Sequence, residues 1–163
     1  MKRRIVVKVG SNVLTREDGK LDVTRMSALV DQIAWLRKQN IEVILVTSGA
    51  VACGRRELTV DHSLDSVEQR QLFSAVGQVK LVGLYYDLFR EFGIHVGQVL
   101  TMKENFQPGE QYRNQQACMT VMLEPVRGQL FRGPEQRRVL RRFILLYSQG
   151  GALPDGPQQL FPD

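Results

Sequence analysis

The sequence predicts an α/β fold built on a parallel sheet. Two apolar segments, Arg4 to Val9 and Ile41 to Val46, are rich in β-branched residues without polar alternation, as in parallel strands covered on both faces. A helical pattern lies between them, and each strand ends in a glycine-containing turn. A strand, a helix and a strand in this order form a βαβ unit. Its right-handed crossover brings the carboxyl ends of both strands, and so both turns, to one edge of the sheet.

The helix of this unit is predicted to begin after Asp22, whose carboxylate can cap the first backbone N–H groups. It is expected to end near Asn40, because asparagine tolerates the left-handed conformation at a helix end. Between these two residues the apolar positions recur at three- and four-residue spacing. They are Met26, Leu29, Val30, Ile33 and Leu36.

Beyond the second strand, helices and strands continue to alternate. The turn at 47–50 leads into a second helix, and two helical patterns follow at 65–77 and 79–92. A third strand is predicted from Ile94 to Thr101, although Gly97 interrupts it. A last helix is predicted from Glu110 to Glu124. Its expected apolar face consists of Ala117, Val121 and Met122, and that of the 79–92 pattern of Leu81, Leu84, Tyr85, Leu88 and Phe89.

Composition indicates a globular chain, with 43% hydrophobic and 24% charged residues. The net charge of +5 is uneven: residues 1–124 carry 16 Lys and Arg against 14 Asp and Glu, and residues 125–163 carry six against three. The nearly neutral main part lacks a basic stripe interleaved with aromatics, so nucleic acid is not an expected partner. No segment approaches the roughly 20 apolar residues of a membrane span. Cys53 and Cys118 are too few for a disulfide framework, so a cytoplasmic protein with reduced thiols is expected.

The composition changes after residue 124. Residues 125–163 hold five of the six prolines and five glycines but no lysine, and we expect most of this tail to be poorly ordered. One part of it fits a short basic amphipathic helix that could lie on an anionic surface, although about eleven residues is marginal for an isolated helix. The basic side would be Arg137, Arg138, Arg141 and Arg142, and the apolar side Val139, Leu140, Phe143, Ile144 and Tyr147.

The first glycine turn follows a strand that contains Lys8. A lysine within an apolar strand is costly unless its ammonium reaches an anion or water. With Gly10 and Ser11 in the turn behind it, Lys8 fits a cation that contacts a transferring phosphoryl group. The alternative is a lysine that extends from the strand end into solvent.

The second turn, Ser48, Gly49 and Ala50, offers a hydroxyl and N–H groups to a carboxylate. Alternatively, Ser48 caps the helix that follows. Neither turn matches GxxxxGK[ST] or GxGxxG. His62 and His95 have no partner in sequence, so both are expected to be solvated or satisfied residues of the structure.

These segments resemble the N-terminal part of the glutamate 5-kinases, a branch of the amino acid kinase family. The blocks that carry the resemblance are VVKVGSNVLT at 6–15, VILVTSGAVACGRREL at 43–58, QLFSAVGQVKLVGLYYDLF at 71–89, FGIHVGQVLT at 92–101 and YRNQQACMTVML at 112–123. The combination of KVGS, TSGAVA and AVGQ favours this branch over the kinases of acetylglutamate, aspartate and UMP. The resemblance covers roughly residues 3–124, so we expect the kinase-like part to occupy 1–124 and a non-matching tail to follow at 125–163.

The resemblance implies a three-layer α/β/α sandwich around a mostly parallel sheet, here incomplete. It also implies phosphorylation of the γ-carboxylate of glutamate by ATP with magnesium, the reaction that yields glutamyl 5-phosphate for proline synthesis. Lys8, Gly10 and Ser11 would contact the phosphates of ATP. Ser48, Gly49 and Ala50 would hold glutamate. The oligomeric state stays open, a homo-oligomer included.

The tail departs from this family. In place of the family's next strand and its asparagine- and aspartate-rich loop, the chain reads PVRGQLFRGPEQRRVLRR, and the nucleotide-binding half is missing. We therefore expect a truncated or frameshifted chain that is inactive alone. The alternative is a non-catalytic anion-binding or interaction module with a basic amphipathic tail.

Overall fold

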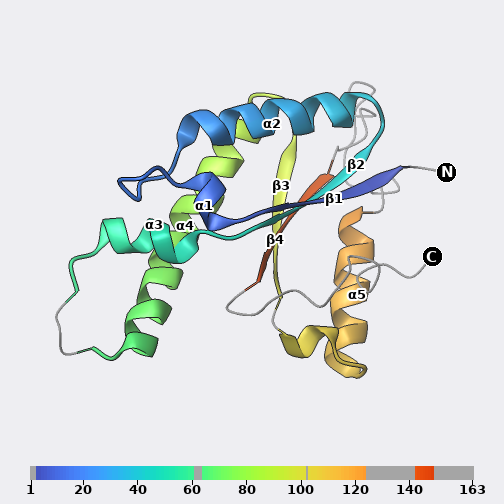
Figure 1. Cartoon of the computed structure of the whole chain (residues 1–163). Coiled ribbons are helices and arrows are strands. Elements are labelled where there is room, and N and C mark those ends of the chain that lie inside the picture. The colour runs from blue at the N-terminus through green and yellow to red at the C-terminus, as the bar shows by residue number, and fades with distance from the viewer. Residues whose placement is uncertain (1–2, 61–63, 102, 124–141, 149–163) are drawn as a thin grey trace, which may run out of the picture.

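The computed structural model describes residues 3–60, 64–101, 103–123 and 142–148 (Figure 1). Its sheet has four parallel strands in the order β1-β2-β4-β3. The strands are β1 (Arg4–Val9), β2 (Glu42–Thr47), β3 (His95–Thr101) and β4 (Arg142–Ser148). The prediction of an α/β fold with a parallel sheet is therefore confirmed, and the first two strands lie within one residue of their expected bounds.

Helix α2 (Val23–Lys38) connects β1 to β2 and begins as the sequence predicts. The Asp22 carboxylate accepts a hydrogen bond from the Arg25 backbone N–H at 3.1 Å. Beyond the end of the helix, Asn40 adopts the left-handed conformation with a φ of 60°. A short helix that the sequence analysis missed, α1 (Ser11–Leu14), precedes α2.

Helix α4 is one continuous element of 25 residues (Ser66–Arg90), so the prediction of two helices at 65–77 and 79–92 is wrong. Gly77 lies inside it rather than between two helices. A glycine inside a helix costs only about 1 kcal/mol, and here the bare backbone lies against α3 (Ala50–Glu57). The predicted apolar face is confirmed, because Leu81, Tyr85 and Phe89 are fully buried.

Helix α5 (Glu110–Leu123) follows β3 and a short 3-10 helix, η1 (Lys103–Phe106). The prediction of the helix itself is confirmed, but its expected apolar face is partly wrong. Ala117 is exposed and Val121 is 64% exposed, whereas Met119 is buried. The helix packs on the sheet through Met119 and Met122, so its buried face is rotated from the expected one.

Strand β4 corrects the expectation of an amphipathic helix in the tail. Residues Arg142–Ser148 form a parallel strand between β2 and β3, while 137–141 lie outside the described residues. The segment FILLY is a short apolar run, and such a run fits a strand between two neighbours as well as it fits one side of a helix. The larger part of the tail, at 124–141 and 149–163, also lies outside the described residues.

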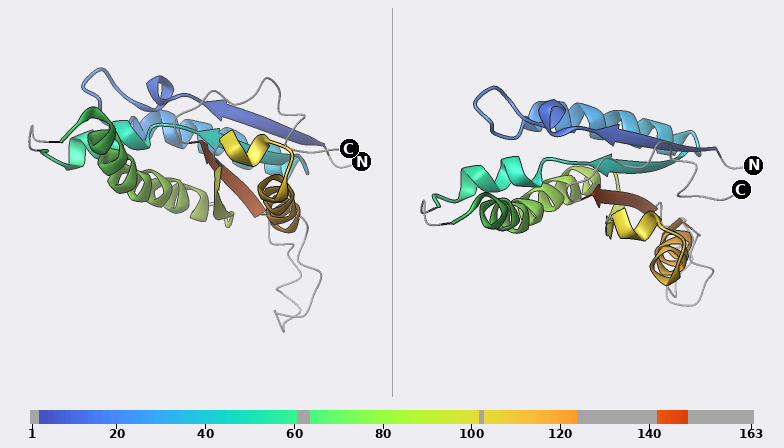
Figure 2. Two further views of the ribbon diagram at one scale, coloured as in Figure 1. Left: turned by 90° about the horizontal axis from the view of Figure 1, so that it is seen from below. Right: turned by 60° about the horizontal axis from the view of Figure 1, so that its bottom comes forward.

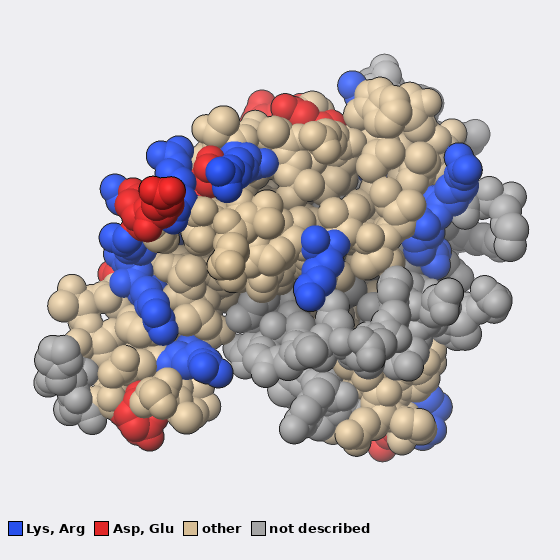
Figure 3. Space-filling model, viewed as in Figure 1, with Lys and Arg blue, Asp and Glu red and all other residues tan. Residues whose placement is uncertain are grey.

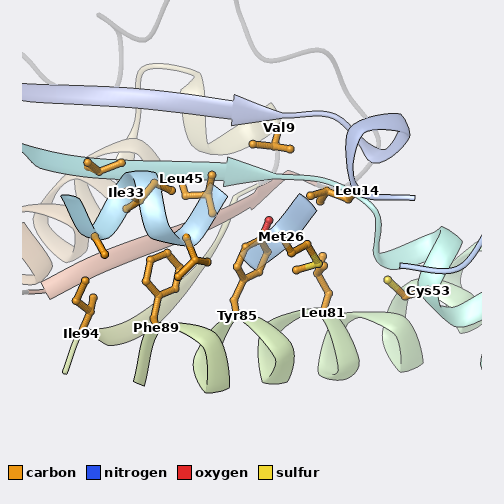
Figure 4. Packing of buried hydrophobic residues seen from close by; sticks show 13 residues of the cluster. Val9, Leu14, Met26, Ile33, Leu45, Cys53, Leu81, Tyr85, Phe89 and Ile94 are labelled. Carbon is orange, nitrogen blue, oxygen red and sulfur yellow. The ribbon is translucent and has the colours of Figure 1, made fainter. Parts of the chain in front are cut away.

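Helices cover both faces of the sheet. On the first face, α2 and α4 pack against alternate residues of β1 and β2, among them Val9 and Leu45 (Figure 4). On the second face, Met119 and Met122 of α5 pack against Ile44, Val46 and Val99. Figure 2 shows α1 and α3 beyond the arrowheads of β1 and β2, with α5 far from them. The carboxyl edge of β1 and β2 is thus formed by the two glycine turns.

Candidate functional site

The two glycine turns lie side by side at the carboxyl edge of the sheet. Val9 and Thr47, the last residues of β1 and β2, are partners in the parallel register. Immediately beyond them, the backbone N–H of Ser48 donates to the Val9 carbonyl at 3.1 Å, and the Ser48 hydroxyl donates to the same oxygen at 3.3 Å. This double hydrogen bond joins the second turn to the strand that carries the first. The crossover argument from sequence therefore placed the turns correctly.

The first turn positions the backbone at the start of α1. Gly10 is the N-cap residue of this helix, and its carbonyl accepts a hydrogen bond from Val13 N–H at 3.1 Å. At the other end, the Thr15 hydroxyl donates to the Ser11 carbonyl at 3.0 Å and fixes the last turn. No side chain among the described residues caps the first N–H groups of α1.

The second turn requires glycine at its centre. Gly49 has a φ of 123°, a conformation that residues with a side chain rarely adopt, and it is the N-cap of α3. A Cβ atom at Gly49 would lie 3.9 Å from the Cα of Ser11, so a side chain added to the second turn would contact the first. Ser48 is not the N-cap, and the alternative that its hydroxyl caps α3 is wrong. Within the described part of the chain, no side-chain hydrogen bond caps the start of α3.

Lys8 is exposed and lies next to this edge. Its neighbours Val7 and Val9 pack into the core of the first face, so the alternation of a strand directs Lys8 to the second face, where Val6 packs. No carboxylate of the described residues pairs with Lys8. Both earlier interpretations, a phosphate ligand and a solvated strand end, are compatible with this position.

Two glycines hold the second turn against α4. A Cβ atom at Gly54 of α3 would lie 1.9 Å from the Phe73 carbonyl oxygen, and one at Gly77 of α4 would lie 1.8 Å from the Ala50 carbonyl oxygen. Both distances are far below any real Cβ contact, so the backbones of α3 and α4 touch directly. The glycine of the AVGQ motif therefore supports the Ser48-Gly49-Ala50 turn from behind. The motif can be recognised in the sequence, but this role follows only from the contact between α3 and α4.

Charged side chains surround the loop between α1 and α2. Asp18 lies near Arg16, Lys20 and Arg56, and a hydrogen bond from the Lys20 backbone N–H, at 3.0 Å, lowers the pKa of its carboxyl. Figure 3 shows a row of blue side chains down the left end of the molecule, with red side chains beside it. Arg55 and Arg56 of α3 are both exposed.

The residues of the site are better suited to phosphate and carboxylate groups than to a metal ion. An exposed ammonium and uncapped helix N–H groups suit phosphate and carboxylate oxygens. A metal ion has less to bind, because the described residues contain no group of three or more His, Cys, Asp and Glu side chains that could hold one. His95 is exposed at the start of β3, and His62 lies outside the described residues. The turns thus fit the phosphates of a nucleotide, but they do not themselves form a magnesium site.

Comparison with known proteins identifies related sequences over this same region. The model of the amino acid kinase family matches residues 3–130. A glutamate 5-kinase of Bacteroides thetaiotaomicron is 69% identical over 121 residues, which are 74% of this chain and 34% of that protein. The glutamate 5-kinase of Chlorobaculum tepidum is 44% identical over 122 residues, 75% of this chain and 34% of that protein. That of Shewanella sediminis is 40% identical over 121 residues, 74% of this chain and 32% of that protein.

The curated relatives match about three quarters of this chain, and the family model extends to residue 130. The chain spans about a third of the length of these curated relatives. None of the helices that the structure describes combines the length and the apolar character needed to cross a bilayer. The region of similarity contains β1, β2 and β3, both glycine turns and the helices α2 to α4.

Proposed function

The chain belongs to the amino acid kinase family, and on this basis we propose that it carries the phosphate-binding and glutamate-binding turns of an ATP-dependent carboxylate kinase. The observation that carries the proposal is the double hydrogen bond from Ser48 to the Val9 carbonyl, which holds the two turns in contact. In this proposal the backbone N–H groups of both turns and the Lys8 ammonium serve one ligand-binding site at the sheet edge. The relatives named glutamate 5-kinase support glutamate as the carboxylate substrate.

Each residue has a distinct part in this proposal. Lys8 neutralises non-bridging phosphate oxygens of ATP, while the N–H groups at Gly10 and Ser11 donate to the same phosphates. Ser48, Gly49 and Ala50 hold the substrate carboxylate through N–H groups at the start of α3. In the transfer, an oxygen of the γ-carboxylate forms a bond to the γ-phosphorus, and the bond from that phosphorus to the bridging oxygen of ADP breaks. The chain's contribution is to position the two reactants in line.

We further propose that this chain binds its ligands weakly and does not complete the transfer. It spans about a third of the length of its relatives, and the metal that accompanies ATP in kinases has no carboxylate cluster among the described residues. Magnesium, when bound with ATP, would offset the negative charge of the phosphates. Two free cysteines, one of them buried, support a reducing compartment such as the cytoplasm. The alternative interaction module relied on an amphipathic helix in the tail. Arg142–Ser148, most of which were expected to be part of that helix, form β4 instead.

Calorimetric titration of the full 163-residue chain tests the binding step. We expect ATP binding to weaken at least about tenfold in Lys8→Ala, since a hydrogen bond to a charged group contributes about 1.5–3 kcal/mol. Lys38→Ala is the matched control, because Lys38 is exposed in the last turn of α2, at the amino end of the sheet. Binding of neither ATP nor glutamate to the unmodified chain would refute the proposal.

A hydroxylamine trap for glutamyl phosphate tests the absence of turnover. With ATP, glutamate and magnesium present, we expect the unmodified chain to form no more hydroxamate than Lys8→Ala. Hydroxamate formation that Lys8→Ala abolishes would show a complete catalytic site and contradict the second part of the proposal.

A further inference from the structure

Tyr85 is a buried polar side chain to which the proposed reaction assigns no role. It lies on α4 and is fully buried. Its ring stacks on Phe89, with the ring centroids 6.2 Å apart. Figure 4 shows the ring rising from α4 with the hydroxyl oxygen directed toward the strands. Burial raises the pKa of Tyr85 to about 12, so the hydroxyl keeps its proton at neutral pH.

The Tyr85 hydroxyl meets the last residue of β2. Its oxygen lies 3.3 Å from Oγ1 of Thr47, a residue that is itself only 1% exposed. The Thr47 hydroxyl in turn donates to the Ser48 carbonyl at 3.4 Å. Because a threonine hydroxyl has a single proton, Thr47 must accept from Tyr85 when it donates to Ser48. The hydrogen bonds therefore run in one direction, from α4 to the second turn.

Helix α4 touches the second turn at two points. Gly77, about two helical turns before Tyr85, lies against the carbonyl of Ala50, the first residue of α3. Tyr85 reaches Thr47, the residue that enters the turn, and Gly77 meets the residue that leaves it. The two residues between these contacts are Ser48 and Gly49, the glycine with a φ of 123°.

We propose that Tyr85 is a positioning residue, which holds the Ser48-Gly49-Ala50 turn in its ligand-ready conformation through Thr47. The proposal deepens the function proposed above, since the turn it fixes is the one assigned to glutamate. Tyr85 does not touch the ligand. Its hydroxyl restrains Thr47, and the restrained Ser48 keeps both of its hydrogen bonds to the Val9 carbonyl.

Backbone hydrogen exchange of the full chain, followed by NMR, tests this without any ligand. The variant Tyr85→Phe removes only the hydroxyl and keeps the stacked ring. We expect exchange of the Ser48 and Cys53 amides, which donate to Val9 and Gly49, to become about five- to tenfold faster. The Met26 amide in α2, which donates to Asp22, should change less than about twofold. Unchanged exchange at Ser48, or an equal acceleration at Met26, would overturn the proposal.

Two further variants isolate the hydroxyl contact. Tyr86→Phe is the matched control, because Tyr86 is 48% exposed on the same helix and should leave all three amides unchanged. Thr47→Val removes the other partner and should reproduce the acceleration at Ser48, with no further increase in the double variant. If Tyr85→Phe does not fold, Thr47→Val alone decides, since unchanged Ser48 exchange in that variant also overturns the proposal.

Glutamate titration then separates this inference from the proposed function. In a chain that binds glutamate, Tyr85→Phe should weaken binding about fivefold, whereas Tyr86→Phe should not. If the unmodified chain binds no glutamate, the proposed function fails. The exchange of Ser48 still decides whether Tyr85 positions the turn.

Discussion

Among the residues that the structure describes, the two faces of the sheet differ in how many hydrophobic side chains they bury. Among the described side chains, the first face, with α2, α3 and α4, includes thirteen buried hydrophobic residues, whereas the second face, with α5, includes four. Burial of apolar surface is the main favourable term in folding, so the first face supplies most of the stability of the described structure. It also holds the glycine turns in place through Gly77 and Tyr85. The second glycine turn is thus held from the first face, whereas Lys8 lies on the second.

The largest effect is expected where α3 and α4 touch. In Gly77→Ala the new methyl group would lie 1.8 Å from the Ala50 carbonyl oxygen and 2.4 Å from the Gly54 nitrogen. Because both neighbours are backbone atoms, the helices must separate, and we expect a loss of about 4 kcal/mol or more in the free energy of unfolding. Urea unfolding followed by circular dichroism measures it.

Gly83→Ala is the matched control on the same helix. A Cβ atom there would meet nothing within 4 Å, so the substitution should stabilise α4 by about 0.5–1 kcal/mol. Equal effects of the two substitutions would contradict the direct backbone contact of α3 and α4.

A second pair of variants compares the two faces directly. Leu81 on the first face is 0% exposed and Met119 on the second is 1% exposed. Substitution by alanine therefore removes most of a fully buried side chain at either position. We expect Leu81→Ala to cost about 3 kcal/mol and Met119→Ala about 2 kcal/mol, because a cavity in a small cluster collapses more easily. Chemical denaturation of both variants measures the difference. A larger cost at Met119 would reverse the ranking of the faces.

High pH provides a third comparison, since two buried acids lie on the first face. Burial raises the pKa of the Cys53 thiol to about 11 and that of Tyr85 to about 12. An acid whose pKa is raised in the folded state favours folding fully below its unfolded pKa. Stability should therefore be complete below about pH 9 and decline between about pH 9 and 12, by about 2–3 kcal/mol for each group.

Unfolding free energies at pH 8, 9, 10 and 11 test this dependence. Cys53→Ala should flatten the decline between pH 9 and 11, whereas Cys118→Ala should not, because Cys118 is exposed. A decline of the same slope in Cys53→Ala would exclude the buried thiol as its cause.

The first βαβ unit could be predicted from the sequence because its signals are local. The apolar run before Gly10, the cap at Asp22 and the periodicity up to Asn40 each lie within a few residues of the feature they specify. The proximity of the two turns followed from the handedness of the crossover. Their roles in ligand binding came from the resemblance and from chemistry, and they stay predictions.

The features that were missed depend on contacts between distant segments. From the sequence alone, Gly77 indicates the end of a helix. Its position inside α4 is explained only by the backbone of α3, which lies against it. The buried face of α5 is set by the side chains that it meets on the sheet, which selected Met119 over Val121. The apolar run in β4 fits both a helix and a strand, and only its place between β2 and β3 decides. The contact of Tyr85 with Thr47 joins residues 38 positions apart.

The smallest effect on the first face is expected at the start of α2 rather than on its buried side. Asp22→Ala removes the side-chain acceptor of the Arg25 N–H and should cost about 1 kcal/mol. Asp22→Asn keeps an oxygen that can accept this hydrogen bond but loses the charge that lies 3.2 Å from Arg25, so it should recover most of the loss. Thermal unfolding of both variants measures the difference. If Asp22→Asn lowered the stability as much as Asp22→Ala, the ion pair with Arg25 rather than the helix cap would be the stabilising contact. The start of α2 would then be stabilised by charge rather than by the capping hydrogen bond.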